Sequence, residues 1–376
     1  MKSTTTHQNS SIGKEARRGL ARWFSRWLFR SRHRAADIPP TIPVAGIHRI
    51  LICRSAKTLG EVLLLTPLLS EIAARYPGAE VDFITGCGVA ESLVGSYFQT
   101  RSIFTLPGRI ARQPLRFLRS LRRMRAVRYD LVIDPYLLSH SDRLLLSLAR
   151  ARYRLGFDGP RKSGHLTHAV PEPARLQHAG KLPVFLLRTA MGDPTDPTQW
   201  EYPSLDIRMS AGERERGNAV LAAILKARQA TGRRGVIGVY AYATGVKRFD
   251  QAWWYRFLPL IEARYPDHSV LEIVPMFAES LFDDRYPTYY SSDVRKLAAV
   301  LSNLALFVSA DCGVMHLACA SGTATVGIFS VTDIPGWSVY GPGCRTIDAR
   351  NRTAGQIAEE IIAAYGDLAN LPKSVP

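Results

Sequence analysis

Asp311, Gly313 and His316 are the residues whose types and spacing most directly suggest chemistry. The apolar segment 304–308 before them predicts a buried strand, and apolar spacing that begins at Met315 predicts a helix. At the carboxyl end of a strand, a helix N-terminus favours phosphate, and a glycine lets the backbone approach it closely. The stretch therefore predicts an anion-binding turn. The alternative is that Asp311 caps the helix and His316 packs in the core.

A second turn with ionisable residues lies near the amino end. Residues 49–54 predict a strand and residues 62–72 predict an apolar helix, with Lys57, Gly60 and Glu61 between them. Together with a strand at 81–85 this is a βαβ unit, so the turn lies at the ligand-binding edge of a parallel sheet.

A third candidate is the basic segment that contains Thr244, Lys247 and Arg248, between a predicted strand at 235–240 and a predicted helix at 251–265. A lysine over the carboxyl edge of a sheet can neutralise a diphosphate, and the planar fork of an arginine also suits phosphate. The alternative is that both charges are solvated surface residues.

The elements around these turns alternate between short apolar strands and helical patterns, which indicates parallel sheets wound in layers. A third strand is predicted at 131–134, after a basic helix whose Leu118, Leu121, Met124 and Val127 share one face. Residues 192–210, with three prolines and little periodicity, predict an interdomain connection. The pattern then restarts, with predicted helices at 211–230, 292–302 and 353–365 and predicted strands at 270–274 and 325–329.

Composition limits the class of protein. The 376 residues fit two domains, and 46% hydrophobic residues can form substantial cores. No apolar run reaches the ~18 residues of a spanning helix. The five cysteines lack paired or metal-ligand spacing, which favours reduced thiols in the cytoplasm. A net charge of +17 favours a polyanionic partner: nucleic acid, an anionic membrane or a phosphorylated glycolipid.

The amino-terminal extension, residues 1–45, has its own pattern. Its first 13 residues predict disorder, and prolines near residue 40 predict a linker. Residues 14–34 predict a helix with an aromatic face and an arginine face, which suits peripheral contact with an anionic membrane. The alternatives are a domain-packing helix or a nucleic-acid-binding arm.

Three segments resemble the bacterial heptosyltransferases, glycosyltransferase family 9. Residues 311–318, followed by 327–333 and 337–342, are similar to the family signature Asp-Ser/Thr-Gly-x-x-His-Leu-Ala and its following Gly-Pro-Thr-Asp. Residues 54–67 resemble Arg-x-x-x-x-Gly-Asp-x-x-x-x-Thr-Pro, and residues 244–249 resemble a Lys-Arg-Trp segment. The departures from these patterns are Glu61, Phe249, Cys312, Val314, Ser330 and Val331.

The resemblance implies an α/β fold of GT-B architecture, with two facing doubly wound parallel-sheet domains and a cleft between them. Residues 46–205 would bind the acceptor. Residues 206–376 would bind a nucleotide sugar, and their last helix would cross back.

The resemblance also implies roles for individual residues in an inverting displacement that uses neither metal nor cofactor. Glu61 stands where the family carries its catalytic aspartate, so it would be the general base; alternatively it is only a helix-end acid. Lys247 would stabilise the leaving diphosphate. The implied donor-site residues are Thr244, Lys247, Arg248, Asp311, Cys312, Gly313, Met315, His316, Thr332 and Asp333. The implied acceptor-side residues are Lys57, Gly60 and Asp134, of which Asp134 is alternatively a turn cap.

The family's usual donor is ADP-heptose, and its usual acceptor is the lipopolysaccharide core or a related anionic glycolipid at the cytoplasmic face of the inner membrane. Two alternatives remain: a GT-B transferase with another nucleotide sugar and acceptor, or a non-catalytic member that binds a glycan or membrane. Nucleic-acid binding is disfavoured, because the sequence has no motif that reads RNA or DNA.

Overall fold

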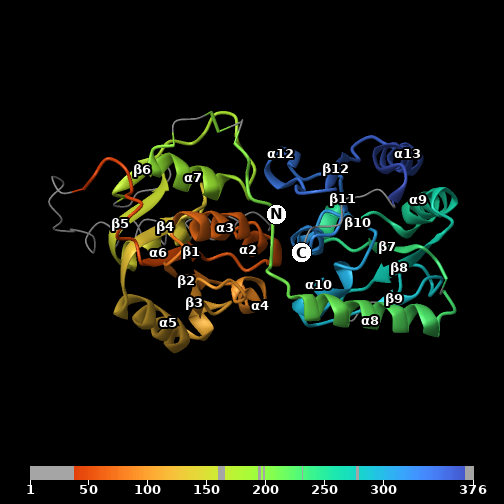
Figure 1. The fold of residues 1–376 in the computed structure, drawn as a ribbon, viewed down its shortest axis with the longest axis horizontal. Coiled ribbons are helices and arrows are strands. Elements are labelled where there is room, and N and C mark those ends of the chain that lie inside the picture. The colour runs from red at the N-terminus through yellow and green to blue at the C-terminus, as the bar shows by residue number, and fades with distance from the viewer. Residues whose placement is uncertain are drawn as a thin grey trace, which may run out of the picture.

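Two six-stranded parallel sheets form the two halves of the molecule, side by side in Figure 1. The computed structural model describes residues 38–159, 166–193, 196–197, 200–230, 232–276 and 279–368. The predicted membrane-binding helix at 14–34, and most of the predicted extension 1–45, lie outside these residues.

The amino-terminal half is built on a sheet with the strand order β3-β2-β1-β4-β5-β6. Its strands are β1 (Arg49–Arg54), β2 (Glu80–Thr85), β3 (Thr100–Thr105), β4 (Arg128–Asp134), β5 (Arg150–Phe157) and β6 (His168–Val170). Its helices are α2 (Leu59–Leu63), α3 (Thr66–Arg75), α4 (Ala90–Val94), α5 (Pro114–Ala126), α6 (His140–Leu148) and α7 (Leu182–Met191). In β1 and β2, every residue after the first is buried, as expected for strands covered on both faces.

The carboxyl-terminal half repeats this plan with the order β12-β11-β10-β7-β8-β9. Its strands are β7 (Gly235–Tyr240), β8 (His268–Ile273), β9 (Thr288–Tyr289), β10 (Leu306–Ala310), β11 (Thr325–Phe329) and β12 (Arg345–Asp348). Its helices are α8 (Ala211–Ala227), α9 (Gln251–Arg264), α10 (Val294–Leu301), α11 (Gly313–Ala320), α12 (Ile334–Trp337) and α13 (Ala354–Tyr365).

Two predicted elements differ from the structure near the candidate turns. The helix predicted at 62–72 is two helices, because Pro67 lacks an N–H and its ring would clash with the carbonyl of Leu63 in a continuous helix. The Thr66 hydroxyl donates to that Leu63 carbonyl at 2.7 Å and stabilises the break. The strand predicted at 304–308 lies two residues later, because Ser309 and Ala310 are small but fully buried in the sheet.

Elsewhere the predicted order of elements was incomplete. Strand β3 was missed, so the predicted third strand is β4. The last described helix, α13, packs against α9 in its own half and does not cross to the other one (Figure 1).

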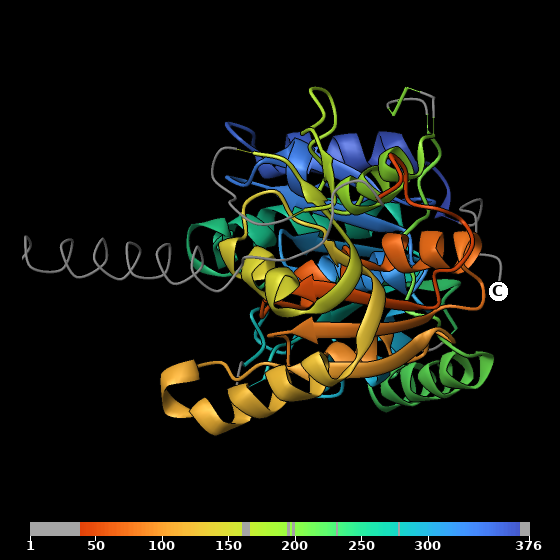
Figure 2. The same cartoon turned by 90° about the vertical axis from the view of Figure 1, so that its left-hand side faces the viewer.

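The two halves contact each other through α2 against α11 and α4 against α10. The turned view in Figure 2 places the carboxyl ends of β1 and β2 on the side where the loop into α5 begins. One buried apolar cluster contains residues of both halves, including Leu64, the C-cap residue of α2, and Leu317 from α11. Among the described residues, no helix has the length and hydropathy needed to cross a membrane.

Candidate active site between the two sheets

The two glycine-containing turns that the sequence singled out lie against each other. A Cβ atom added to Gly60 would stand 3.2 Å from Cδ2 of His316, and one added to Gly313 would stand 3.3 Å from Cβ of Leu59. Both distances are tighter than ordinary van der Waals contact, so glycine permits this approach. The N-termini of α2 and α11 therefore share one site, with Gly60 and His316 at their contact.

Glu61, in the first turn of α2, has both carboxylate oxygens engaged. Its Oε1 accepts a hydrogen bond from the Arg54 guanidinium at 2.5 Å, and its Oε2 accepts one from the Thr58 hydroxyl at 2.6 Å. The Glu61 side chain is 24% exposed, so a substrate can reach it. Since Thr58 is exposed, its hydroxyl is the partner that an acceptor hydroxyl can most readily replace.

Arg54 is the residue that fixes this carboxylate. It is only 5% exposed, and its second nitrogen donates to Asp142 at 3.0 Å. The guanidinium also lies 4.0 Å from the ring centroid of Tyr136. Asp142 is fully buried and accepts the backbone N–H of Ser55 at 2.6 Å. This network holds β1, α2 and α6 together at the carboxyl edge of the sheet.

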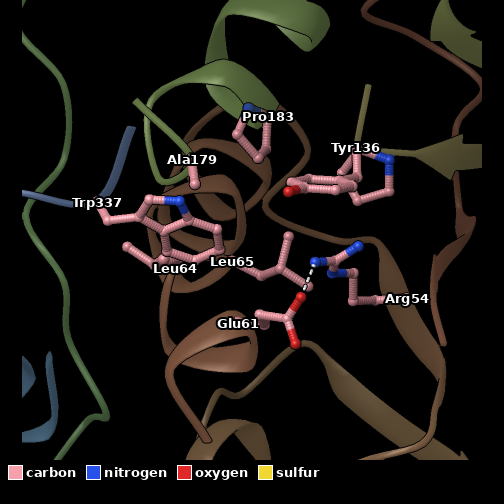
Figure 3. A pocket seen from close by; sticks show the side chains of 9 residues that line it. Arg54, Glu61, Leu64, Leu65, Tyr136, Ala179, Pro183 and Trp337 are labelled. Atoms are coloured by element: carbon pink, nitrogen blue, oxygen red, sulfur yellow. Dashed lines mark hydrogen bonds and ion pairs between the residues drawn. The ribbon is translucent and has the colours of Figure 1, made fainter. Parts of the chain in front are cut away.

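A pocket opens beside Glu61 and contains residues from both halves. Arg54, Glu61 and Tyr136 lie along one part of its wall, and Trp337 from α12 lies opposite (Figure 3). Leu64, Leu65, Pro135, Ala179 and Pro183 complete the lining. The lining therefore combines aromatic rings, apolar side chains and one carboxylate that is paired with an arginine.

On the carboxyl-terminal side, Asp311 is bound by a lysine. The Lys247 ammonium lies 2.7 Å from Oδ2 of Asp311, and the Thr332 hydroxyl donates to the same oxygen. Asp311 does not cap α11, because Cys312 is the N-cap residue and no side chain bonds there. The Lys247 side chain is 33% exposed, so its charge can also reach a ligand.

His316 is held in its neutral form at the junction of the two turns. It is 3% exposed, and its Nδ1 atom has no hydrogen-bond partner among the residues that the structure describes. Burial lowers the pKa of His316 to about 4, and the charges of His178 and Lys247 act in the same direction against the opposing effect of Asp311. Buried polar atoms without a partner are uncommon in proteins, so His316 remains a candidate site residue.

A segment of the amino-terminal half reaches into the other half next to this site. The backbone N–H of Ala179 donates to the Gly336 carbonyl at 2.9 Å. The ring of His178 accepts the Gly180 N–H at 3.0 Å, so its Nε2 carries the proton that is donated to the Ser338 carbonyl at 2.7 Å. Burial lowers the pKa of His178 to about 4. A second hollow, lined by Arg175, Leu176, Gln177, His178, Lys181, Pro335 and Ser338, lies along this contact.

The remaining predicted site residues fall into two groups. In the first group, Lys57, Thr244 and Arg248 are exposed. Lys57 donates to the Gly108 carbonyl at 2.5 Å, and the Arg248 guanidinium lies 6.0 Å from the ring centroid of Tyr242. Asp333 caps α12 by accepting the Gly336 N–H at 2.9 Å.

The second group consists of Met315, Cys312 and Asp134, whose side chains contact other residues of their own half. Met315 is fully buried in an apolar cluster with Phe329 and Val339. Burial raises the pKa of the Cys312 thiol, whose sulfur is 3.3 Å from the Ser309 hydroxyl. Asp134 is fully buried and pairs with Arg143 at 2.9 Å, so its acceptor-side role stays a prediction.

Sequence reasoning missed Arg54, Tyr136, Asp142 and Trp337 as site residues. Arg54 opens the turn motif at 54–67, which was the available signal. Asp142 lies three residues after Ser139, the N-cap of α6. Nothing in the neighbouring sequence connects Asp142 with Arg54, which is 88 residues away. In the described residues, no group of three or more histidine, cysteine or acidic side chains is arranged to hold a metal ion.

Comparison with known families gives one match, which covers residues 292–359. The family is described as glycosyltransferase family 9 (heptosyltransferase). This segment is similar to the family 9 glycosyltransferases. It contains Asp311, Gly313, His316 and Asp333, whereas Glu61 and Lys247 lie outside it. No curated protein matches the chain.

Solved structures extend the similarity over nearly the whole chain at the level of the fold. A glycosyl transferase family 9 protein from Veillonella parvula has a TM-score of 0.71 and 14% identity, over 88% of this chain and 99% of that one. E. coli heptosyltransferase WaaC with ADP has a TM-score of 0.63 and 18% identity, over 84% and 98%. E. coli ADP-heptose lps heptosyltransferase II has a TM-score of 0.61 and 16% identity, also over 84% and 98%.

The paired parallel sheets and the solved structures confirm the predicted GT-B architecture. The family match over residues 292–359 supports the predicted enzyme class, a glycosyltransferase. The roles of individual site residues and the predicted domain boundaries remain predictions.

Proposed function

We propose that this glycosyltransferase moves a heptose from ADP-heptose to the lipopolysaccharide core or a related anionic glycolipid. The observation that carries the proposal is the contact between the Glu61-bearing turn and the family 9 turn, marked by Gly60 against His316. An acceptor bound beside Glu61 and a donor bound at α11 would then react across this contact. The solved structures include E. coli WaaC with ADP and with ADP-2-deoxy-2-fluoro heptose.

In this mechanism the acceptor hydroxyl displaces Thr58 from Oε2 of Glu61 and gives its proton to that carboxylate as it attacks the anomeric carbon. The new C–O bond forms on the face opposite the bond to the nucleotide diphosphate, so the configuration inverts. Arg54 holds the other oxygen of Glu61 and orients the base.

Departure of the diphosphate places negative charge at the N-terminus of α11. The unpaired N–H groups there favour phosphate, and Gly313 leaves room for it. Lys247 forms a salt bridge with Asp311. When the diphosphate lies beside Lys247, the ammonium group also stabilises the negative charge that develops on the diphosphate. Exposed Thr244 and Arg248 lie on the same loop and contribute to donor binding, as do Thr332 and Asp333 beyond β11. No metal or cofactor is assigned to this step.

A non-catalytic donor-binding protein is the second candidate, because both oxygens of Glu61 are already engaged. Under this alternative, the Arg54–Glu61 pair stabilises the fold and no proton is taken from an acceptor.

The test has two stages. Thermal shift with ADP-, UDP-, GDP- and CMP-sugars identifies the donor class, because a bound ligand stabilises the folded protein by mass action. We expect the largest shift with ADP-heptose. Single-turnover transfer from that donor to heptose-deficient lipopolysaccharide should then give product.

If product forms only with another nucleotide sugar, that sugar and not heptose is the group that the protein transfers. Donor binding without product, with the acceptor supplied, would support the non-catalytic candidate. Fractionation of cells that express the protein tests the expected location at the cytoplasmic face of the inner membrane.

A further inference from the structure

An arginine-rich surface on the amino-terminal half has no role in the proposed reaction. Helix α5 packs Phe117, Leu121 and Met124 towards the sheet. Its exposed face carries Leu115, Leu118, Arg119 and Arg122, which recur at the spacing i, i+3, i+4 and i+7 of one helical face. The prediction that Leu118 shares the packed face with Leu121 and Met124 is therefore wrong, because Leu118 is 52% exposed and lies outside their cluster. Ile110 and Arg112 precede the helix in a short 3₁₀ turn. We call these six residues the α5 surface.

The charge of this surface is not neutralised by the surrounding chain. Residues 92–129 contain no aspartate or glutamate, and eight arginines lie between positions 109 and 128. Within the described part of the chain, no ion pair joins any arginine of the α5 surface to a carboxylate. A cluster of arginines without acidic partners favours a polyanionic ligand.

Large apolar side chains stand among these arginines. Leu115 is 80% exposed, Leu118 is 52% exposed and Ile110 is 49% exposed. Figures 1 and 2 show α5 along the outer edge of its half, with no other drawn helix or strand on its outer side. Transfer of such exposed apolar side chains from water into an apolar layer is favourable.

The α5 surface lies close to the acceptor side of the site. Strand β3 runs parallel to β2, so the loop that follows β3 emerges at the same edge as the Glu61 turn. Lys57, in that turn, donates to the carbonyl of Gly108, directly before the α5 surface begins. One hydrogen bond therefore connects the turn with the loop that leads into α5.

We infer that the α5 surface docks the protein onto an anionic lipid bilayer. Arginines match anionic headgroups, and leucines between them can enter the boundary with the acyl chains. A nucleic acid would satisfy the arginines but would leave the leucines exposed, and the aromatic residue of this helix, Phe117, faces the sheet where it cannot stack on bases. The two features together favour the bilayer.

Docking in this way would hold the Glu61 turn near the headgroups, where a glycolipid presents its sugars. The inference concerns binding alone, so it stands or fails separately from the identity of the transferred sugar.

The test uses the full chain and vesicles with and without anionic phospholipid, in sedimentation assays at low and at physiological salt. The variant replaces Arg112, Arg119 and Arg122 with serine. The matched control replaces Arg216, Lys226 and Arg228 with serine, since these exposed cations on and just after α8 give the same change in net charge. Each arginine at an anionic surface contributes about fivefold to affinity, so the first variant should bind on the order of 100-fold more weakly. The control should stay within a few-fold of the unmodified chain.

A second measurement reports the orientation of the bound protein. An environment-sensitive dye on a cysteine at position 115 should shift to the blue with anionic vesicles, whereas the same dye at position 220 on α8 should not. Both positions are exposed in the structure, with Leu115 at 80% and Val220 at 42%. Equal vesicle affinity of the two triple variants, or no dye response at 115, would overturn the inference. Loss of RNA binding with unchanged vesicle binding would assign the surface to nucleic acid instead.

Discussion

The two turns that meet in the site each hold a carboxylate against a cation, but the two pairs differ in depth and connectivity. Arg54 is 6% exposed in its side chain and also binds Asp142, which is fully buried. Lys247 is 33% exposed and binds only Asp311 among the carboxylates of the described residues. Arg54 is therefore fixed by two anions from separate elements, whereas Lys247 has a single bond to exchange.

This difference separates a positioning cation from a ligand-binding cation. Moving Arg54 would leave Asp142 as a buried charge without its partner, which is costly. Moving Lys247 towards a phosphate exchanges one anion for another near solvent. The amino-terminal turn thus favours a fixed geometry for Glu61, and the carboxyl-terminal turn favours an adaptable charge.

The largest expected effect comes from removing the proton acceptor on the fixed side. Glu61→Gln preserves the shape of the side chain and should lower the single-turnover transfer rate by roughly 10²- to 10⁴-fold, because general base catalysis is lost. Donor affinity, measured by calorimetry, should barely change. Glu61→Asp is the control, and it should retain more activity than Gln since it keeps the carboxylate. Undiminished transfer by the Gln variant would remove Glu61 as the base.

Substituting the two cations with leucine tests the comparison directly. Arg54→Leu should lower the free energy of unfolding by about 3 to 5 kcal/mol, because it leaves Asp142 buried without its charged partner. Lys247→Leu should lower it by about 1 kcal/mol or less, as expected for a partly exposed pair. Urea denaturation followed by circular dichroism gives both values. Similar losses in the two variants would show that depth does not distinguish the pairs.

The sequence could predict each turn but not how the turns complement each other. Apolar strands followed by glycines are local patterns, so β1, β2, β10 and the start of α11 could be read from neighbouring residues. The split of the predicted helix at Pro67 could also have been read, because a proline after Thr66 is a local signal.

Long-range partners carry no such signal. Asp142 meets Arg54 across 88 positions, and Gly60 meets His316 only because the two halves pack together. Strand β3 was missed because just one of its six residues is fully buried, which leaves its apolar pattern weak. The approximate place of a ligand site follows from strand-to-helix turns, whereas the pairing of its charges depends on the finished fold.

His316 provides a test of burial at the contact between the turns. Its pKa of about 4 in the folded protein lies below the usual 6.5, so the unfolded chain binds a proton more readily. The free energy of unfolding should be unaffected by this group above about pH 6.5 and should fall by about 2 to 3 kcal/mol as the pH approaches 4.5. His316→Gln should remove this part of the pH dependence.

His178→Gln is a matched control, because burial lowers the pKa of His178 to the same value of about 4 at a different contact between the halves. Each single variant should remove one portion of the loss measured between pH 7 and pH 4.5, and the double variant should remove both. An unchanged pH dependence in His316→Gln would mean that the histidine becomes protonated in the folded protein without cost.

The smallest expected effect is on donor affinity at the adaptable side. Lys247→Ala should weaken ADP binding by about 1.5 to 3 kcal/mol, the usual value of a charge-assisted hydrogen bond to phosphate. Adenosine binding should change little, because adenosine has no phosphate for the lysine to contact. Isothermal calorimetry with both ligands separates a lost phosphate contact from a general disturbance of the site.

Asp311→Asn is the companion variant: it removes the charge that holds Lys247 and keeps a similar side-chain shape. If Lys247 exchanges between Asp311 and phosphate, the Asn variant should bind ADP at least as tightly as the unmodified chain. Weaker ADP binding in that variant would mean that Asp311 positions the lysine instead of competing for it, and the two cations would then be alike in function.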